Sequence, residues 1–297
     1  MATRAQWIDG ARLRTLAISI APVLIGTAAA VDIDAVVWWK ALLALVVSFF
    51  LQVGINYAND YSDGIRGTDD VRVGPQRLVG SGAATPGAVK RAAFVCFGVA
   101  GAAGLVLALT TAWWLVLVGA ACVAAAWFYT GGSHPYGYLG FGEIFVFVFF
   151  GLVATVGTTF VQAHRVTLGS VLGAVAAGLL ACAVLVANNL RDIPTDSTVG
   201  KRTLSVRIGD RSSRLVYTGF VIVAFILVIA LALAWTPWAL LGLGGAALAV
   251  RPVRIVLSGA GGMSLIPVLK FTGFAELVMA AGLLLGTALG TALGTVG

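Results

Sequence analysis

Nine long apolar segments, each close to the length that crosses a bilayer, constrain this sequence more than any other feature. A hydrocarbon core roughly 30 Å thick requires about 20 apolar residues per helix. The predicted segments are residues 13–31, 36–58, 88–109, 112–130, 141–162, 168–190, 214–235, 236–257 and 271–290. These runs are long and do not alternate between apolar and polar residues, so they indicate helices rather than strands. The sequence therefore predicts an all-α, polytopic membrane protein with about nine transmembrane helices.

The composition supports this fold class and excludes others. Of the 297 residues, 60% are hydrophobic and 10% are charged, whereas a soluble domain carries about 25% charged residues. A chain this apolar has too little polar surface to face water on all sides. The composition excludes a soluble enzyme, a secreted disulfide-rich scaffold and a disordered chain.

The basic residues predict the orientation in the membrane. Of the 19 Lys and Arg residues, all but Lys40 and Arg165 lie in the N-terminal tail or in residues 59–91, 191–214 and 251–270. Basic loops are retained in the cytoplasm, so we expect the N-terminus and the two long loops there and the C-terminus outside. An odd number of spans, here nine, also places the two termini on opposite sides of the membrane. The basic residues behind the net charge of +7 thus indicate which side of the membrane each loop occupies. Because this accounts for the charge, we expect no nucleic-acid partner.

Two acidic motifs follow the second and the sixth predicted spans. Seven of the twelve acidic residues lie in these two predicted loops, namely Asp60, Asp63, Asp69, Asp70, Asp192, Asp196 and Asp210. Asn56 precedes Asp60 by four residues, and Asn188 precedes Asp192 by the same spacing. Asn188 lies 132 residues after Asn56, and Asp192 lies 132 residues after Asp60. The spacing predicts a four-helix repeat, residues 36–130 and 168–257, that brings two similar sites face to face.

The motifs favour a metal-bound phosphate ester as their ligand. Residues four apart lie on one face of a helix, so each Asn–Asp set points in one direction. Oxygen ligands without His or Cys favour Mg²⁺ or Ca²⁺ over zinc or copper. Basic residues are interleaved with the acids, namely Arg66, Arg72, Arg77, Arg191, Lys201, Arg202 and Arg207. A calcium cage does not need these cations, whereas a metal-bound phosphate ester does.

Simpler interpretations exist for each of these residues alone. A single Asp can cap a helix, and a single Arg can follow the positive-inside rule. Tyr138 fits an interfacial aromatic belt, with a substrate-facing position as the alternative. Glu143 suits the start of the fifth span, and Glu276 suits an intramembrane hydrogen bond. Two matched acidic motifs on one side of the membrane are harder to explain in this way.

Four stretches of the sequence resemble the membrane-embedded aromatic prenyltransferases of quinone biosynthesis, especially the branch that prenylates 1,4-dihydroxy-2-naphthoate in menaquinone synthesis. They cover about residues 12 to 210. The stretches are Leu13-Arg14-Thr15-Leu16 with Ala21-Pro22, Asn59-Asp60-Tyr61-x-Asp63 with Gly74-Pro75-Gln76-Arg77, Gly137-Tyr138-Leu139-Gly140-x-Gly142-Glu143, and Asn188-Asn189-Leu190-Arg191-Asp192-x-x-x-Asp196-x-x-x-Gly200-Lys201-Arg202-Thr203.

The resemblance implies one membrane-embedded domain, residues 1–297, with helices around a central cavity. Mg²⁺ would hold a polyprenyl diphosphate at the cytoplasmic mouth. The implied catalytic and metal-binding residues are Asp60, Asp63, Asp192 and Asp196. The implied substrate-binding residues are Asn56, Asn59, Arg66, Arg77, Tyr138, Asn188, Arg191 and Lys201. The wider family has a third aspartate where this chain has Gly67, and Asp69 or Asp70 is the candidate replacement.

The implied reaction joins the prenyl group to dihydroxynaphthoate in the plasma membrane of a bacterium, with loss of diphosphate and CO₂. An acceptor of the 4-hydroxybenzoate type is the alternative within the family. A CDP-alcohol phosphotransferase would share Asp60-x-x-Asp63-Gly64, but its further residues do not follow. A transporter would place charged residues near the middle of the bilayer, whereas these acids gather at one face. The sequence predicts no protein partner.

Overall fold

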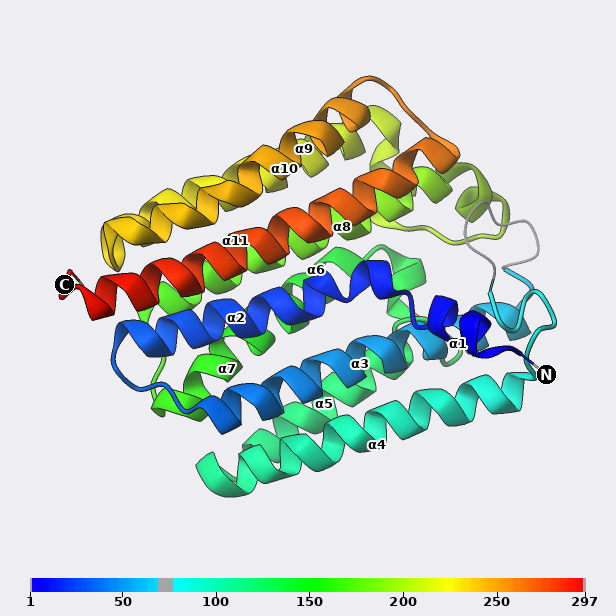
Figure 1. The fold of residues 1–297 in the computed structure, drawn as a ribbon. Coiled ribbons are helices and arrows are strands. Elements are labelled where there is room, and N and C mark those ends of the chain that lie inside the picture. Colours follow the sequence, from blue (N-terminus) through cyan, green and yellow to red (C-terminus); the bar gives the residue numbers. More distant parts are fainter. Residues whose placement is uncertain (1, 69–76, 296–297) are drawn as a thin grey trace.

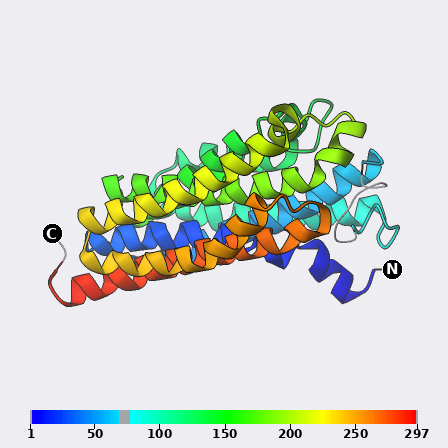
Figure 2. The ribbon, with the colours of Figure 1, turned by 90° about the horizontal axis from the view of Figure 1, so that it is seen from above.

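Long helices run side by side in this computed structural model, and the two termini lie at opposite ends of the bundle (Figures 1 and 2). The structure describes residues 2–68 and 77–295. Every regular element within these two ranges is helical. The prediction of an all-α fold is confirmed.

The elements follow one another without a strand between them in the described ranges. The α-helices are α1 (Arg4–Gly10), α2 (Ala17–Asp32), α3 (Trp38–Ile65), α4 (Pro86–Thr111), α5 (Leu115–Phe128), α6 (Gly142–Val146), α7 (Ala154–Ala163), α8 (Leu168–Thr198), α9 (Leu204–Ala234), α10 (Gly244–Leu257) and α11 (Ile266–Ala292). The 3₁₀ turns are η1 (Leu13–Thr15), η2 (Tyr136–Leu139), η4 (Pro237–Leu243) and η5 (Gly262–Leu265). A π-helical turn, η3 (Phe147–Val153), joins α6 to α7.

Seven helical stretches of the described chain are long and apolar enough to cross a membrane, judged by length and composition. They are α3, α4, the run from α6 to α7, α8, α9, the run from η4 to α10, and the run from η5 to α11. The other two predicted segments form α2, with 16 residues, and α5, with 14 residues. Each predicted segment therefore corresponds to a helix, and seven of them reach spanning length.

Two helices continue well beyond the predicted ends of their apolar runs. Helix α3 extends to Ile65 and α8 extends to Thr198, although the runs end near residues 58 and 190. Asp60, Asp63, Asp192 and Asp196 therefore lie on the last turns of these helices, and the expectation that these four residues lie in loops is wrong. The apolar pattern reports where a helix contacts lipid, and a polar helix continues beyond that point because its backbone hydrogen bonds stay within the helix.

Two large buried clusters, with two smaller ones, form the interior of the described bundle. One cluster joins α2, α8, α9 and α11 around side chains such as Leu180, Tyr217 and Met279. The other joins α1, α3, α4 and α5 around side chains such as Val53 and Phe97. Small residues permit the closest approaches in membrane bundles. At Gly151 in η3, an added Cβ would lie 2.6 Å from the Cα of Gly178 in α8.

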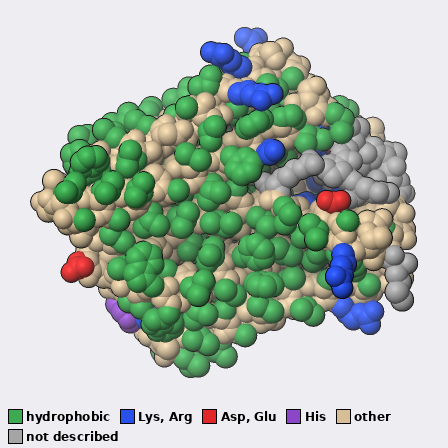
Figure 3. Space-filling model, in the orientation of Figure 1, with side chains coloured by type: hydrophobic (Ala, Val, Ile, Leu, Met, Phe, Trp, Pro, Cys, Tyr) green, Lys and Arg blue, Asp and Glu red, His purple; other side chains and the backbone are tan. Residues whose placement is uncertain are grey.

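Apolar side chains also cover the outside of the bundle. Figure 3 shows hydrophobic side chains across most of one face, with most of the visible Lys and Arg near the upper edge and the end that holds the N-terminus. Large side chains are strongly exposed there and elsewhere; Leu233 of α9, for example, is 87% exposed. Patches of this extent mark a surface that contacts lipid or another apolar partner. The exterior therefore agrees with a membrane-embedded chain.

Candidate active site

The two acidic motifs lie at the same end of the bundle, which is also the end of the N-terminus (Figure 1). The last turns of α3 carry Asp60 and Asp63, and the last turns of α8 carry Asp192 and Asp196. All four aspartates are buried, with 7% or less of each exposed. Burying ionised carboxylates is unfavourable unless cations or hydrogen-bond donors compensate. The contacts of each carboxylate therefore show how this end of the bundle is organised.

Asp60 holds the segment that follows α3. Its Oδ2 accepts a hydrogen bond from the backbone N–H of Leu78 at 2.8 Å, and its Oδ1 accepts one from that of Val79 at 2.9 Å. A carboxylate that accepts two backbone N–H groups is well suited to fix a loop. Asp60 thus anchors residues 78–79, and sequence analysis did not predict this contact.

Asp63 lies between a tyrosine and an arginine. The Tyr138 hydroxyl donates to Asp63 Oδ1 at 2.7 Å, and a guanidinium nitrogen of Arg77 lies 3.6 Å from Oδ2. Burial, and next the charge of Asp63, raise the pKa of Tyr138. The phenol therefore stays protonated at neutral pH and remains a hydrogen-bond donor to Asp63.

The second motif is organised by side-chain ion pairs. Arg191 donates through Nε to Asp192 Oδ1 and through a terminal nitrogen to Oδ2, both at 2.6 Å. The same terminal nitrogen donates to Asn188 Oδ1 at 2.9 Å. Lys201 Nζ lies 3.5 Å from Asp196 Oδ1. Each aspartate of this motif therefore contacts a cation from its own helix or from the segment just after it.

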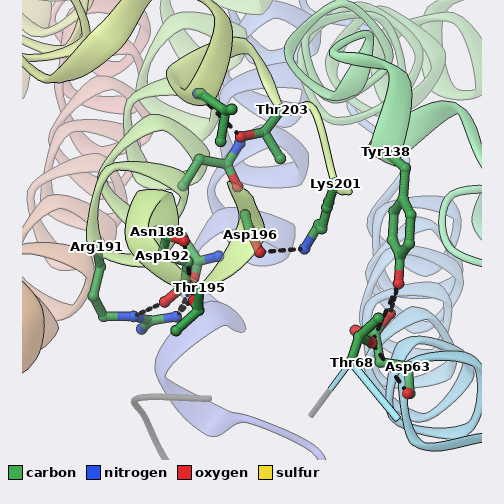
Figure 4. Close-up of polar contacts among 12 residues, drawn as sticks. Asp63, Thr68, Tyr138, Asn188, Arg191, Asp192, Thr195, Asp196, Lys201 and Thr203 are labelled. Atoms are coloured by element: carbon green, nitrogen blue, oxygen red, sulfur yellow. Dashed lines mark hydrogen bonds and ion pairs between the residues drawn. The ribbon is translucent and has the colours of Figure 1, made fainter. Parts of the chain in front are cut away.

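The segment after α8 folds back over the site through Gly200. Its φ of +75° lies in the left-handed region that favours glycine. The backbone N–H of Lys201 then donates to the carbonyl of Asp196 at 2.9 Å. This fold directs the Lys201 side chain toward Asp196, as Figure 4 shows.

Lys201 and Tyr138 connect the two motifs. Lys201 Nζ lies 5.3 Å from the centroid of the Tyr138 ring, within the range of a cation–π contact. The backbone N–H of Arg202 also donates to the carbonyl of Tyr138 at 2.9 Å. A continuous set of contacts therefore runs from Asp196 through Lys201 and Tyr138 to Asp63 (Figure 4).

The remaining predicted residues lie around these contacts. Arg66 stacks 5.5 Å from the Tyr138 ring and donates to the backbone carbonyls of Thr130 and Gly132. Asn59 Oδ1 accepts from the Thr130 hydroxyl at 2.8 Å. Asn56 donates to the carbonyl of Ala11 at 2.8 Å. The structure thus brings together the predicted residues that it describes. Asp69 and Asp70 lie outside the described residues.

A cavity of about 930 Å³ opens beneath the two motifs. Its polar end is lined by Asn56, Asn59, Asp63, Arg77, Asn188 and Lys201, among others. Most of the remaining lining is apolar and includes Phe145, Phe149 and Phe150. The lining reaches Leu105 and Val116, which are 48% and 46% exposed on the outside of the bundle. This shape suits a molecule with a charged head and a long apolar tail.

The side chains suit a hard divalent cation only together with its ligand. Within residues 2–68 and 77–295, no group of three His, Cys, Asp or Glu side chains could hold a metal ion by itself. The lining nevertheless includes the carboxylate residue Asp63 and the amide residues Asn56, Asn59 and Asn188, whereas Asp60, Asp192 and Asp196 lie outside it. Mg²⁺ commonly uses one or two carboxylates and completes its coordination with water and substrate phosphates. The donor set therefore fits Mg²⁺ that arrives with a phosphate ester.

Several polar residues of the cavity were not predicted as site residues from the sequence. Arg12, Thr15 and Gln52 line it beside Asn56. Asn189 also lines it, and its amide nitrogen donates to Glu143 Oε1 at 3.0 Å. Gln52 could have been found, because a glutamine four residues before Asn56 is unusual within an apolar run and shares its helix face.

Comparisons with known proteins agree with this architecture. The sequence model of the "UbiA prenyltransferase family" matches residues 19–260. The 1,4-dihydroxy-2-naphthoate octaprenyltransferase of Mycobacterium tuberculosis is 59% identical over 280 residues, which cover 94% of this chain and 96% of that relative.

Two solved archaeal structures share the fold. A UbiA homologue from Aeropyrum pernix matches with a TM-score of 0.72 at 15% identity, over 91% of this chain and 97% of that one. A homologue from Archaeoglobus fulgidus, bound to GPP and Mg²⁺, matches with a TM-score of 0.68 at 14% identity, over 95% and 99% of the two chains.

Proposed function

The chain belongs to the UbiA prenyltransferase family, and from that premise we propose that it transfers a polyprenyl group from a polyprenyl diphosphate to 1,4-dihydroxy-2-naphthoate in menaquinone biosynthesis. One observation assigns this reaction to particular residues of the chain. The two acidic motifs, connected through Lys201 and Tyr138, cover the polar end of a cavity whose other walls are apolar. A diphosphate fits the charged end, and an isoprenoid tail fits the apolar part.

The diphosphate would lie between Lys201 and Arg77. In the structure these cations contact Asp196 and Asp63. On binding, both cations would turn toward phosphate oxygens, and the two carboxylates would become ligands of Mg²⁺. Asp60 and Asp192 would complete the carboxylate set, with Asp69 as a further candidate ligand. Bound Mg²⁺ would neutralise the diphosphate charge and so improve it as a leaving group.

The apolar walls would protect the reactive intermediate. When the bond between the prenyl carbon and the diphosphate oxygen breaks, its electron pair leaves with diphosphate and an allylic cation remains. Phe145, Phe149 and Phe150 line the cavity and exclude water, which would otherwise capture the cation. The tail would pass Leu105 and Val116 and enter the lipid.

The aromatic acceptor would then complete the transfer. The electron-rich ring attacks the cation at the carbon that carries the carboxylate, and a new carbon–carbon bond forms. Loss of CO₂ returns an electron pair to the ring and restores its aromaticity. The diphosphate departs with Lys201 and Arg77 as its counter-charges, because both cations face the polar end of the cavity.

The orientation in the membrane is part of the proposal. Helices α2 and α5, about 24 Å and 21 Å long, would complete nine spans together with the turns that flank them. The N-terminus and both acidic motifs would face the cytoplasm of a bacterium, and the C-terminus would lie outside. The distribution of Lys and Arg supports this topology.

The whole chain, residues 1–297, would act as one domain that contains a four-helix repeat. Helix α3 packs on α4 within residues 36–130, and α8 packs on α9 within residues 168–257. Asp63 and Asp196 lie on the first helix of each pair; Asp63 lines the cavity, and Asp196 contacts Lys201, which lines it too. This arrangement supports a repeat in which each half contributes one acidic motif.

Product analysis tests the proposed reaction directly. Purified protein is mixed with Mg²⁺, octaprenyl diphosphate and dihydroxynaphthoate labelled at its carboxyl carbon. We expect a prenylated product without the carboxyl group, identified by mass, and one labelled CO₂ for each diphosphate released. Label retained in the prenylated lipid would contradict the dihydroxynaphthoate assignment.

A further inference from the structure

A group of polar side chains lies deeper in the cavity than the acidic motifs. Arg12, Thr15, Gln52 and Asn56 all line the cavity wall. Along α3, Asn56 and Gln52 precede Asp60 by four and eight residues, so they lie about 6 Å and 12 Å from it along the helix axis. The proposed diphosphate site does not use these groups, apart from the predicted Asn56, because they lie below the charged mouth.

Hydrogen bonds fix the orientation of the Gln52 amide. The carbonyl of Ala11 can only accept, so the Asn56 Nδ2 that lies 2.8 Å away must be the donor. The Asn56 Oδ1 therefore faces Gln52 and accepts from its Nε2 at 3.2 Å. The Thr15 hydroxyl donates to the carbonyl of Arg12, so its oxygen accepts the second N–H of Gln52, also at 3.2 Å.

This network leaves one strong acceptor without a donor. Gln52 is 4% exposed, and its Oε1 has no hydrogen-bond partner among the described residues. A buried amide oxygen without a donor costs about 1–3 kcal/mol. The arrangement is therefore matched to a ligand that donates a hydrogen bond, such as a hydroxyl group.

Arg12 presents a matching cationic group. One terminal nitrogen of its guanidinium is buried and has no partner among the described residues. The Arg12 backbone has a φ of +54°, and its carbonyl accepts from both the N–H and the hydroxyl of Thr15. A buried guanidinium nitrogen requires an acceptor, and an anionic oxygen is the best one.

An apolar wall lies beside these polar groups. Ile18, which follows Thr15 by three residues, packs in one cluster with Ala181 and Val184, and Phe150 and Leu269 pack against this cluster. These five residues also line the cavity. A planar aromatic ring could lie against such a wall while its substituents reach Arg12 and Gln52.

We propose that Arg12 and Gln52 form the binding site for the aromatic acid acceptor, with the carboxylate on the Arg12 guanidinium and a ring hydroxyl donating to Gln52 Oε1. This inference rests on the proposed function, because it assigns the acceptor of that reaction. A diphosphate does not fit here, because its oxygens carry no hydrogen for Gln52 Oε1 and would be repelled by it. The ring then lies one to two helical turns below the diphosphate, where it can reach the prenyl carbon.

Steady-state kinetics with both substrates tests the assignment. Arg12→Gln should raise the KM for dihydroxynaphthoate by about 10- to 100-fold, the effect of losing a charged hydrogen bond, and Gln52→Met by about tenfold. Both variants should leave the KM for octaprenyl diphosphate within about twofold. Arg12→Lys, which keeps the positive charge, should recover part of the affinity. Arg165→Gln, in the loop before α8, is the matched control and should change neither KM.

Binding of 1,4-naphthalenediol, which lacks the carboxylate, separates the two contacts. Arg12→Gln should change the Kd of the diol by less than about twofold, and Gln52→Met should raise it by about tenfold. Size-exclusion chromatography in detergent shows whether each variant is folded. If Gln52→Met is not folded, the measurements on the Arg12 variants test the assignment by themselves.

The assignment is overturned if Arg12→Gln weakens the binding of octaprenyl diphosphate and leaves the binding of dihydroxynaphthoate unchanged. It is also overturned if Arg12→Gln weakens the binding of the diol as much as the binding of dihydroxynaphthoate. The proposed function fails by a different result. In that case the wild-type protein itself does not prenylate dihydroxynaphthoate.

Discussion

The two acidic motifs occupy equivalent positions 132 residues apart, yet their carboxylates make different kinds of contact. Asp60 in the first motif accepts hydrogen bonds from the backbone of residues 78 and 79. Asp192 in the second motif pairs through both oxygens with the side chain of Arg191. Asp63 and Asp196 contact Arg77 and Lys201 at longer distances of 3.6 Å and 3.5 Å.

The difference separates two tasks, which are the anchoring of a chain segment and the binding of a charged ligand. Backbone contacts fix the position of a chain segment, whereas side-chain ion pairs can exchange partners when a charged ligand arrives. The first motif anchors a loop through Asp60, and in the proposed function it would bind the ligand through Asp63. The second motif would offer ion pairs that a metal-bound diphosphate replaces. The four predictions below test this division.

The largest effects are expected from the two matched aspartates. Asp60→Asn and Asp192→Asn should each lower kcat by at least about a hundredfold, because each removes a preorganised charge at the diphosphate site. Only Asp60→Asn should also loosen residues 78–79, because an asparagine offers one oxygen where two backbone N–H groups need acceptors. Hydrogen exchange of residues 77–84 measures this difference.

The control for this pair is Asp210→Asn. Asp210 also pairs through both oxygens with an arginine, Arg214, at 2.6 Å and 2.7 Å. Its side chain is 59% exposed, whereas Asp60 and Asp192 are buried. Turnover should therefore change little. Equal loosening of residues 77–84 in Asp60→Asn and Asp192→Asn would contradict the proposed division of tasks.

A smaller effect is expected from Lys201→Ala. The loss of a positive charge beside the diphosphate should raise the KM for octaprenyl diphosphate by about 10- to 100-fold. The KM for dihydroxynaphthoate should change much less, because the proposed acceptor site at Arg12 and Gln52 lies deeper in the cavity than Lys201. Kinetics with each substrate varied in turn measures both constants. Equal loss of affinity for both substrates would reassign Lys201 to the structure of the mouth.

The smallest effect is expected from Tyr138→Phe. This change removes the hydroxyl that donates to Asp63 and keeps the ring beneath Lys201. The loss of one hydrogen bond should lower kcat/KM for the diphosphate by about two- to tenfold. Burial raises the pKa of Tyr138, so the hydroxyl is protonated below pH 10 and the effect should be constant from pH 6 to pH 9. A loss that appears only above pH 8 would contradict this.

Sequence patterns predicted the helices and the common location of the motifs, because each has a physical signal in one dimension. Apolar runs of about 20 residues record contact with lipid. The Asn56–Asp60 and Asn188–Asp192 pairs have the same internal spacing, and an even number of predicted helices separates the two pairs. An even number of helices returns the chain to the same end of the bundle. These signals do not depend on the details of packing.

The contacts of the site could not be predicted in the same way. Tyr138 reaches Asp63 from 75 residues away, and Gln52 is oriented by the carbonyl of Ala11 through Asn56. Such contacts depend on how the helices pack, and neither spacing nor composition reports that. The ends of α3 and α8 were also predicted too early, because a helix continues into polar sequence without any apolar signal.

The central claim is that both motifs hold one metal-bound diphosphate at the mouth of the cavity. The most direct measurement is the affinity of purified protein for an unreactive polyprenyl thiodiphosphate, determined by calorimetry with Mg²⁺ and again with EDTA. We expect EDTA to weaken binding at least tenfold, and Asp63→Asn and Asp196→Asn each to weaken it about tenfold when Mg²⁺ is present. Binding that is unchanged by EDTA, or weakened by only one of the two substitutions, would contradict the claim.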